Sequence, residues 1–535
     1  MIQLKGKAFS SGFARGIAYV YSDILESNHA AYNISKDQHD AEYDRIDSAK
    51  EEVRQQLFDS AKRVGSALNK NVADIFLAQE TMLVDPQLVD DLKQTLGQKH
   101  VNAEQVIGTV FRRWIRKFRD SPSTMLNERA DDIEDLYRRM LRVLVGVEAH
   151  KLEKLPENTI LVARSLMPSD TVFLTRKSCS GILLEIAAPT AHSTILAREF
   201  GVPCVGQVRG LILKVNTGDE ILVDGNTGKV FVNPTEVVIE TYHTARKKHV
   251  RQSAKAIKNR FKSAATTNGQ EVTVMANASS SGDIIRAVDS GADGIGLFRT
   301  ERFFLAAKAL PTVPEFRKYL LRCLKPLGDK SINLRLLDIG GDKIIPYLSL
   351  PFELNPFLGR RGVRLLFDFP ALLKIQIKAI LSVSKKYNVR ILIPMVTFAE
   401  EVKKVRVMCE TISKQMKIPM IQIGAMIETP AAALAVPSLC KYADFLCIGT
   451  NDLTQYVMAA DRESALVSKY FRDDHSIILG LLESIAVNAG ETPVTLCGEL
   501  AVKRDALSSI LKTGICSLSI APLSTPGIKE AVRRV

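Results

Sequence analysis

The chain has no apolar run long enough to cross a bilayer, although apolar residues make up 46% of its 535 residues. Its first residues lack the apolar core of a signal peptide, so we expect a cytoplasmic protein without membrane insertion. The eight cysteines form no C-x-x-C pair, which argues against a disulfide framework and a thiolate zinc site. HExxH and EF-hand motifs are absent as well. These absences leave a globular chain of about two to four domains.

Acidic residues are missing from one stretch, residues 242–270, which holds a dense run of lysines and arginines. The whole chain has a net charge of +13, which raises the question of nucleic-acid binding. The excess of basic over acidic side chains is local, because residues 36–148 hold 18 basic and 21 acidic side chains. The basic run from Arg246 to Lys262 contains one aromatic residue, Phe261, so it offers no ladder for stacking bases. We therefore expect a solvated linker helix and no nucleic-acid partner.

The hydrophobic pattern changes three times along the chain. Short apolar runs with glycines in residues 1–25 resume at Thr159 and are typical of a small α/β domain. Between them, apolar residues at helical spacing, such as Ile46, Val53 and Leu57, predict a helical bundle inserted into that domain. We expect an α/β domain in 1–25 and 150–235, a helical domain in 26–149, a linker helix in 236–265 and a third domain in 266–535.

Strand-like and helix-like segments alternate from residue 266 to the end. The apolar runs predict strands at 272–276, 293–298, 332–338, 390–396, 421–427, 444–449, 493–498 and 515–520. Eight βα units of this total length indicate a (β/α)8 TIM barrel. An open doubly wound sheet would explain the same alternation and is the alternative.

Polar residues follow these strands, at the end where barrel active sites form. Glu428 and Asp452 come after neighbouring strands, and two carboxylates with substrate oxygens and water suit Mg²⁺. Arginines offer paired N–H groups to phosphate or carboxylate oxygens. The combination predicts a site that binds a small phosphorylated carboxylate together with a metal ion. The arginines concerned are Arg299, Arg335, Arg361 and Arg462.

A second candidate site surrounds His192, which follows a strand-like run and opens a helix-like segment. Backbone N–H groups and the helix dipole favour an anion at such a position, and a phosphorylated imidazole is one. Thr190 would cap this helix or bind a phosphate oxygen. A lone histidine is more often structural, but this position would stabilise a phosphorylated imidazole.

With these motifs the chain resembles enzyme I of the phosphoenolpyruvate–sugar phosphotransferase system over nearly its whole length. The phosphohistidine motif of that family matches Thr190, His192, Ile195, Ala197 and Arg198. Its barrel motifs match 294–301, 335–343, 355–359 with Arg361, 427–432, 449–456, 461–462 and 497–499, in the same order. Eight motifs in sequence make the resemblance specific.

The resemblance implies that phosphoenolpyruvate (PEP) phosphorylates His192 and that the group then passes to the carrier protein HPr, the first step of sugar uptake. It implies that Cys497 protonates the departing enolate to give pyruvate. It assigns Mg²⁺, or Mn²⁺, to Glu428 and Asp452. The implied PEP ligands are Arg299, Arg335, Asn451, Asp452 and Arg462, supported by Thr190, Arg198 and Arg361. HPr docking on the helical domain, swivelling on the linker helix and a homodimer formed through the barrel are implied as well.

The chain departs from the family pattern near the histidine. Ala187 and Ala188 replace two glycines, Ala191 replaces a serine, and Arg302 replaces an apolar residue. We expect His192 to be phosphorylated more slowly for this reason, and a regulatory paralogue that senses PEP is the alternative. Pyruvate phosphate dikinase and PEP synthase share the two domains, but they also need an ATP-grasp domain. The first 150 residues show no nucleotide loop for one.

Overall fold

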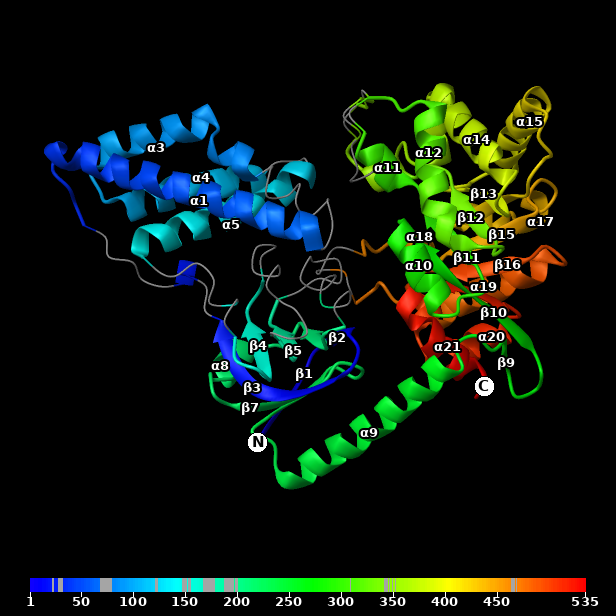
Figure 1. The fold of residues 1–535 in the computed structure, drawn as a ribbon, viewed down its shortest axis with the longest axis horizontal. Helices are drawn as coiled ribbons and strands as arrows, with labels where there is room; N and C mark the ends of the chain where they lie inside the picture. The colour runs from blue at the N-terminus through cyan, green and yellow to red at the C-terminus, as the bar shows by residue number, and fades with distance from the viewer. Residues whose placement is uncertain are drawn as a thin grey trace. The chain divides into compact units, whose positions relative to one another are not determined.

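The computed structural model divides into two compact units, residues 1–249 and 250–535. It describes all residues except 22–23, 27–31, 68–78, 121–123, 147–151, 153–154, 167–178, 187–196, 198–200, 308, 341–344, 346, 349, 352, 463–466 and 468. The first unit combines a β-sheet with a helical bundle, and the second is a barrel of strands surrounded by helices (Figure 1).

An eight-stranded sheet in the first unit has the order β1-β8-β7-β3-β4-β5-β6-β2. Strands β3 to β6 run parallel, whereas β1, β2, β7 and β8 join by antiparallel pairs. The first strands of the chain thus complete a sheet formed largely after residue 158, as predicted. The strands are β1 (Ile2–Lys5), β2 (Lys7–Ser10), β3 (Phe13–Tyr21), β4 (Thr159–Ala163), β5 (Gly181–Leu184), β6 (Cys204–Gly206), β7 (Glu220–Asp224) and β8 (Lys229–Val232), and α8 (Leu211–Lys214) precedes β7.

A helical bundle lies between β3 and β4 in the chain, which confirms the predicted insertion. Its described helices are α1 (His39–Ala67), α3 (Pro86–Lys99), α4 (Ala103–Arg119) and α5 (Thr124–Val145). The side chain of Asp85 accepts a hydrogen bond from the backbone N–H of Gln87 at 2.8 Å and caps α3. The buried faces of α1, α4 and α5 form one apolar core, to which Val53, Phe111 and Met140 contribute.

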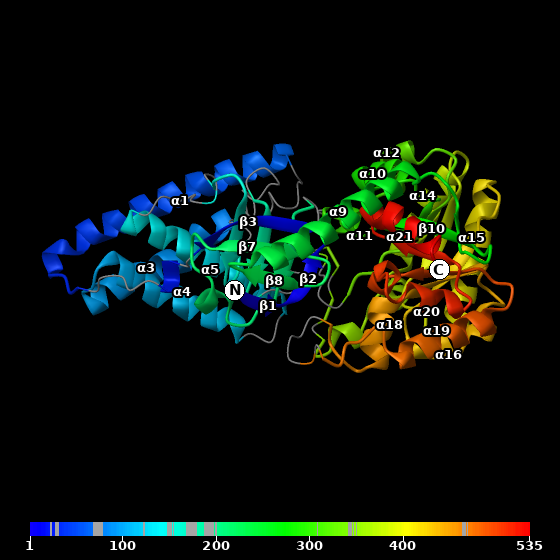
Figure 2. The same cartoon turned by 90° about the horizontal axis from the view of Figure 1, so that it is seen from below.

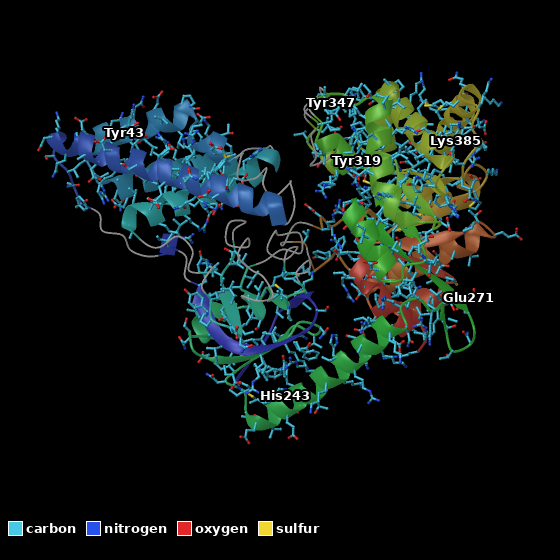
Figure 3. All side chains as sticks on the ribbon, viewed as in Figure 1. Tyr43, His243, Glu271, Tyr319, Tyr347 and Lys385 are labelled. Atoms are coloured by element: carbon cyan, nitrogen blue, oxygen red, sulfur yellow. The ribbon has the colours of Figure 1, made fainter. Side chains whose placement is uncertain are left out.

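Helix α9 (Glu236–Lys258) contains the boundary between the two units. Within the first unit, the Tyr242 hydroxyl donates to Val223 O at 3.3 Å, and Arg15 Nη1 lies 3.0 Å from Nε2 of His243 (Figure 3). Within the second unit, Lys255 Nζ lies 3.1 Å from Glu530 Oε1. The helix ends at Lys258, and β9 (Ala264–Ala265) pairs with the first barrel strand, so these last residues of the predicted linker belong to a sheet.

Eight parallel strands close into a barrel in the second unit. β10 pairs in parallel with both β11 and β17, which closes the ring and excludes the open sheet. The predicted TIM barrel is therefore confirmed. Its strands are β10 (Glu271–Ala278), β11 (Ile295–Arg299), β12 (Ile332–Arg335), β13 (Val389–Ile393), β14 (Ile423–Ile427), β15 (Phe445–Gly449), β16 (Val494–Cys497) and β17 (Ser517–Ile520).

The barrel helices cover the outside of the strands (Figure 2). They are α10 (Ser281–Asp289), α11 (Glu301–Leu305), α12 (Val313–Leu324), α13 (Val363–Asp368), α14 (Pro370–Ser384), α15 (Ala399–Met416), α16 (Pro430–Leu434), α17 (Val436–Leu439), α18 (Thr450–Val457), α19 (Ser476–Ala489), α20 (Leu507–Lys512) and α21 (Thr525–Val532). Two tyrosines labelled in Figure 3 make hydrogen bonds to segments that follow β10 and β11. The Tyr319 hydroxyl donates to Ser279 O, and the Tyr347 hydroxyl donates to Phe304 O. Across the described chain, no helix has the length and apolar character needed to span a membrane.

Candidate active site at the carboxyl end of the barrel

The carboxyl ends of the barrel strands carry the predicted substrate and metal residues. Arg299 ends β11 and Arg335 ends β12, and these two residues are paired in register. Glu428 follows β14 directly, Asp452 lies in the first turn of α18 after β15, and Cys497 ends β16. Because parallel strands end on the same rim of a barrel, one site gathers side chains that are up to 198 positions apart in the sequence, from 299 to 497.

Two carboxylates hold Arg335 in a buried position. Nη2 of Arg335 donates to Glu301 Oε1 at 2.5 Å, and Nη1 lies 3.0 Å from Asp338 Oδ2. The Thr300 hydroxyl donates to the backbone oxygen of Arg335 at 2.8 Å. Burial disfavours the charge of the guanidinium, but Glu301 and Asp338 outweigh it and raise the pKa of Arg335. Arg335 is thus a fixed cation at the rim.

Arg361, in the segment after β12, uses all five of its N–H groups within the protein. Nε and Nη2 donate to the two oxygens of Asp338, each at 3.1 Å. Nη1 and Nη2 donate to the two oxygens of Asp452 at 2.9 and 3.2 Å. The remaining Nη1 N–H faces the Tyr456 hydroxyl at 3.3 Å. Against the effect of burial, Asp338 and Asp452 raise the pKa of Arg361, so the side chain is a permanently charged bridge.

Glu428 is a buried carboxylate with 1% exposure. Its Oε1 accepts a hydrogen bond from the Met395 N–H at 2.6 Å. A Cβ at Gly449 would lie 2.8 Å from Glu428 Oε2, so a glycine is needed for the carboxylate to approach this backbone. Burial, followed by the charges of Asp338 and Asp452, raises the pKa of Glu428 to about 8. Such crowding of carboxylates favours a bound cation, and the two predicted metal residues fit Mg²⁺ by their chemistry.

The turn after β16 is held against the start of α18. Gly498 has φ +114°, and a Cβ there would lie 2.2 Å from Thr450 Oγ1. The Thr450 hydroxyl donates to the Cys497 backbone oxygen at 3.1 Å. The Glu499 N–H donates to Asn451 Oδ1 at 3.2 Å. The amide of Asn451 is thereby fixed beside Asp452, where the sequence predicted a substrate ligand.

Cys497 has 1% exposure and belongs to an apolar cluster inside the barrel. Its neighbours in that cluster are Leu297, Leu392, Met426, Phe445 and Cys447. A hydrogen bond with Cys497, and after it burial, raises the pKa of Cys447, so this second thiol stays neutral. Cys497 therefore stands at the strand end with apolar side chains behind it, which is a setting that keeps water away from a thiol.

Arg299 and Arg462 are the more accessible arginines of the site. Arg299 is exposed at the end of β11. Partial desolvation by the surrounding barrel, followed by the charge of Arg335, lowers the pKa of Arg299. Arg462 Nη1 lies 3.8 Å from Asp452 Oδ1, and the Arg462 N–H donates to Gln455 Oε1 at 3.2 Å. The positive charges of Arg335 and Arg462 repel that of Arg299, and such a cluster of guanidinium groups favours the binding of an anion between them.

The phosphohistidine motif falls largely outside the described residues. This applies to Thr190, His192 and Arg198 and to the alanines at 187, 188 and 191, all between β5 and β6 in the chain. Ala197 is described and is 2% exposed, and its backbone oxygen accepts a hydrogen bond from the Ser10 hydroxyl at 3.4 Å. The role of His192 therefore stays a prediction.

Three residues of the barrel site were not predicted to have a role there. Glu301 and Asp338 lie in the matched motifs, each shortly after an arginine at a strand end, and they turn out to orient Arg335 and Arg361. An acid within three residues of such an arginine is a usable sequence signal. Tyr456 also lies in a matched motif, at the end of 449–456, but no nearby residue signals its contact with Arg361, which depends on how α18 packs.

Comparison with known proteins agrees with this geometry. The model of the PEP-binding domain of PEP-utilising enzymes matches residues 253–535, and those of their N-terminal and mobile domains match 5–129 and 155–228. The phosphoenolpyruvate-protein phosphotransferase of Staphylococcus carnosus is 32% identical over 99% of this chain and 94% of its own length. The chain belongs to the phosphoenolpyruvate-protein phosphotransferases. The enzyme of that name from Haemophilus influenzae is also 32% identical, over 99% of this chain and 94% of its own.

One solved structure that resembles part of this phosphoenolpyruvate-protein phosphotransferase is of an enzyme I. A solution structure described as enzyme I (nEIt) is 27% identical, with a TM-score of 0.41, over 46% of this chain and 99% of its own length. The model of the PEP-binding domain matches the barrel, which also carries the arginines. PEP is therefore the substrate that binds to the barrel.

Proposed function

We propose that this phosphotransferase moves the phosphoryl group of PEP to its own His192 and then to a histidine of the carrier protein HPr, as the first step of a sugar-uptake system. In the first half-reaction an imidazole nitrogen of His192 attacks phosphorus. The bond between phosphorus and the enol oxygen breaks, and the enolate of pyruvate leaves. In the second, the phosphoryl group passes from His192 to HPr.

The observation that carries the proposal is the gathering of arginines and carboxylates at the carboxyl end of the barrel. Phosphoryl transfer needs positioning and charge neutralisation more than covalent chemistry by the protein. Arg299 and Arg462 are accessible to the phosphate and carboxylate of PEP, while Arg335 and Arg361 are held in place by acids. Asn451, fixed by its oxygen, adds an amide donor beside them.

Glu428 and Asp452 would hold Mg²⁺, with Mn²⁺ as a substitute. When bound, the metal would neutralise charge on the phosphate oxygens. Both carboxylates come from the same rim. Burial, followed by the negative charges of Asp338 and Asp452, raises the pKa of Glu428, and a bound cation would relieve that crowding of charge. Asp452 also accepts hydrogen bonds from Arg361, which holds its carboxylate in place beside the substrate residues.

Cys497 would deliver the proton that turns the departing enolate into pyruvate. The proton goes from the thiol to the methylene carbon of the enolate, and the thiolate regains a proton from water after product release. The apolar cluster around Cys497 supports this role, because a site that excludes water prevents protonation from solvent at the wrong moment.

His192 must meet PEP at the barrel and HPr elsewhere, so the proposal includes movement of the domain that carries it. The domain matched as the mobile domain contains His192, and α9 is its connection to the barrel. We further propose that the helical bundle docks HPr, that the barrel forms a homodimer and that the enzyme works in the cytoplasm.

A phosphotransfer assay tests this function. The purified chain, Mg²⁺ and labelled PEP would be incubated with and without HPr, beside the His192→Ala variant. Acid-labile label that appears on the chain, moves to HPr and is missing in the variant would support the proposal. Binding of PEP without any label would instead identify a PEP sensor and overturn the transfer function.

A further inference from the structure

Tyr456 links Arg361 to the segment of chain that carries it. The tyrosine lies on α18, one helical turn after Asp452, so both residues face the same side of the helix. Its hydroxyl oxygen accepts a hydrogen bond from Arg361 Nη1 at 3.3 Å. The same hydroxyl donates to the backbone oxygen of Phe357 at 2.5 Å. One side chain therefore contacts the arginine and the backbone four residues before it.

Phe357 also contacts the arginine through its ring. It belongs to the short 3-10 helix η4 (Pro356–Leu358), and the Arg361 guanidinium carbon lies 5.9 Å from the centre of the ring. A cation over an aromatic face gains a modest attraction and a preferred orientation. By holding the Phe357 backbone, Tyr456 keeps this ring against Arg361.

The contacts of Arg361 differ in what they fix. Asp338 and Asp452 bind four of its five N–H groups and set the plane of the guanidinium. Tyr456 takes the fifth and ties the guanidinium to η4, from which the backbone continues to Arg361 itself. Without the hydroxyl, the two carboxylates would still hold the charge, but η4 would lose its hydrogen bond to α18.

We propose that Tyr456 is a positioning residue that sets the affinity for PEP through Arg361 and η4. The inference rests on the proposed function of the barrel site. The hydroxyl contacts Arg361 and the Phe357 backbone, and among the described residues it makes no hydrogen bond to Cys497. The chemical steps should therefore change little when it is removed. The effect of losing it is an altered PEP dissociation constant, with the rate at saturating PEP retained.

The test compares the full-length chain with Tyr456→Phe and with Tyr470→Phe as a matched control. Tyr470 is an exposed tyrosine of the same unit, with 57% exposure. The PEP dissociation constant would be measured by calorimetry in the presence of Mg²⁺. We expect a rise of about fivefold in Tyr456→Phe, the fold-change of one net hydrogen bond, and no change in Tyr470→Phe.

A second readout separates positioning from general loosening. Single-turnover labelling at saturating PEP, and transfer from the labelled chain to HPr, should both stay within about twofold of the parent in Tyr456→Phe. Amide hydrogen exchange at Leu358 and Gly359, whose N–H groups bond to Asn355 and Pro356, should become faster.

Unchanged or tighter PEP binding in a folded Tyr456→Phe protein would overturn the inference. If that variant does not fold, Phe357→Leu tests the same linkage, because it removes the ring beside Arg361; weaker PEP binding is expected there and unchanged binding would contradict it. Failure of the parent chain to become labelled would overturn the proposed transfer, while the PEP dissociation constants would still decide the role of Tyr456.

Discussion

Arg361 donates to both carboxylate oxygens of Asp452, at 2.9 and 3.2 Å. The same guanidinium also donates to both oxygens of Asp338. A planar fork can satisfy two carboxylates in this way, whereas an ammonium group cannot. The pair joins the segment after β12 to the helix after β15, so the proposed substrate and metal residues from different strands form one electrostatic unit.

Replacing the guanidinium group of Arg361 is expected to impair the reaction strongly. Arg361→Lys keeps the charge but loses the paired hydrogen bonds to Asp338 and Asp452, so kcat/KM for PEP should fall about 100-fold. Steady-state pyruvate release with HPr present would measure it. The neighbouring Arg360→Lys is the matched control, because Arg360 is exposed and its ion pair with Asp368 spans 3.5 Å. Equal losses in both variants would show that the fork geometry is not what matters.

Gly498 is expected to be irreplaceable for a steric reason. In Gly498→Ala the added Cβ would lie 2.2 Å from Thr450 Oγ1 at a φ of +114°, which should destabilise the barrel by about 1–3 kcal/mol and weaken PEP binding. Calorimetric unfolding and PEP titration would measure the two effects. Gly480→Ala, in the exposed middle of α19 with open space around its Cβ, should be neutral or stabilising. A stable, fully active Gly498→Ala protein would refute this.

Asp283 should make the barrel stability depend on acid pH. Burial alone would raise the pKa of Asp283, but hydrogen bonds from Ser279, Ser280 and Arg286 prevail and lower it. A lowered pKa in the folded state stabilises the protein above the unfolded value of about 3.9, and this contribution is lost as pH falls through the folded pKa. Asp283→Asn should therefore cost about 1 kcal/mol at pH 7 and less below pH 4.

Urea unfolding followed at several pH values would test the Asp283 prediction. Asp289→Asn, at the other end of α10, is the control, since Asp289 is exposed and close to the helix C-terminus. An acid at that end gains nothing from the helix dipole, so its removal should not destabilise the barrel. A pH-independent difference between the parent and Asp283→Asn would contradict the prediction.

Cys497 should affect turnover without affecting affinity. Cys497→Ser is expected to lower the rate of pyruvate formation about 100-fold or more, because a positioned general acid contributes that much. The PEP dissociation constant should stay within about twofold, since the arginines are unchanged. Cys440→Ser, a partly buried thiol outside the site, should leave both values unaltered. A Cys497→Ser enzyme with parental turnover would exclude the thiol as the proton donor.

The barrel could be predicted from the sequence because its strands are buried on both faces. Such strands read as short continuous apolar runs, as in 423–427 and 445–449, and regular alternation with helices fixes their number. The pairing of β10 with β17, which closes the barrel, could not be predicted from the sequence, since a closed and an open sheet have the same alternation of strands and helices. Closure depends on strand tilt and stagger, which spacing does not encode.

The site was predictable to the extent that strand ends converge. Glu428 directly follows an apolar run, Asp452 comes three residues after one and Cys497 ends one, so their common location could be inferred. The carboxylate that pairs with each arginine could not be inferred, because this pairing depends on the path of the chain after the strand. Met395 shows this, since its N–H donates to Glu428 from a residue with an unusual φ of +53°, which its residue type does not predict.

The central claim is that PEP phosphorylates His192, and mapping the phosphorylated peptide tests it most directly. The full-length chain would be treated with labelled PEP and Mg²⁺, digested under alkaline conditions that preserve a phosphoryl–nitrogen bond, and sequenced by mass spectrometry. We predict a single acid-labile phosphoryl group on the peptide that contains His192. Label found only on another residue, or pyruvate released with no phosphorylated peptide, would contradict the account.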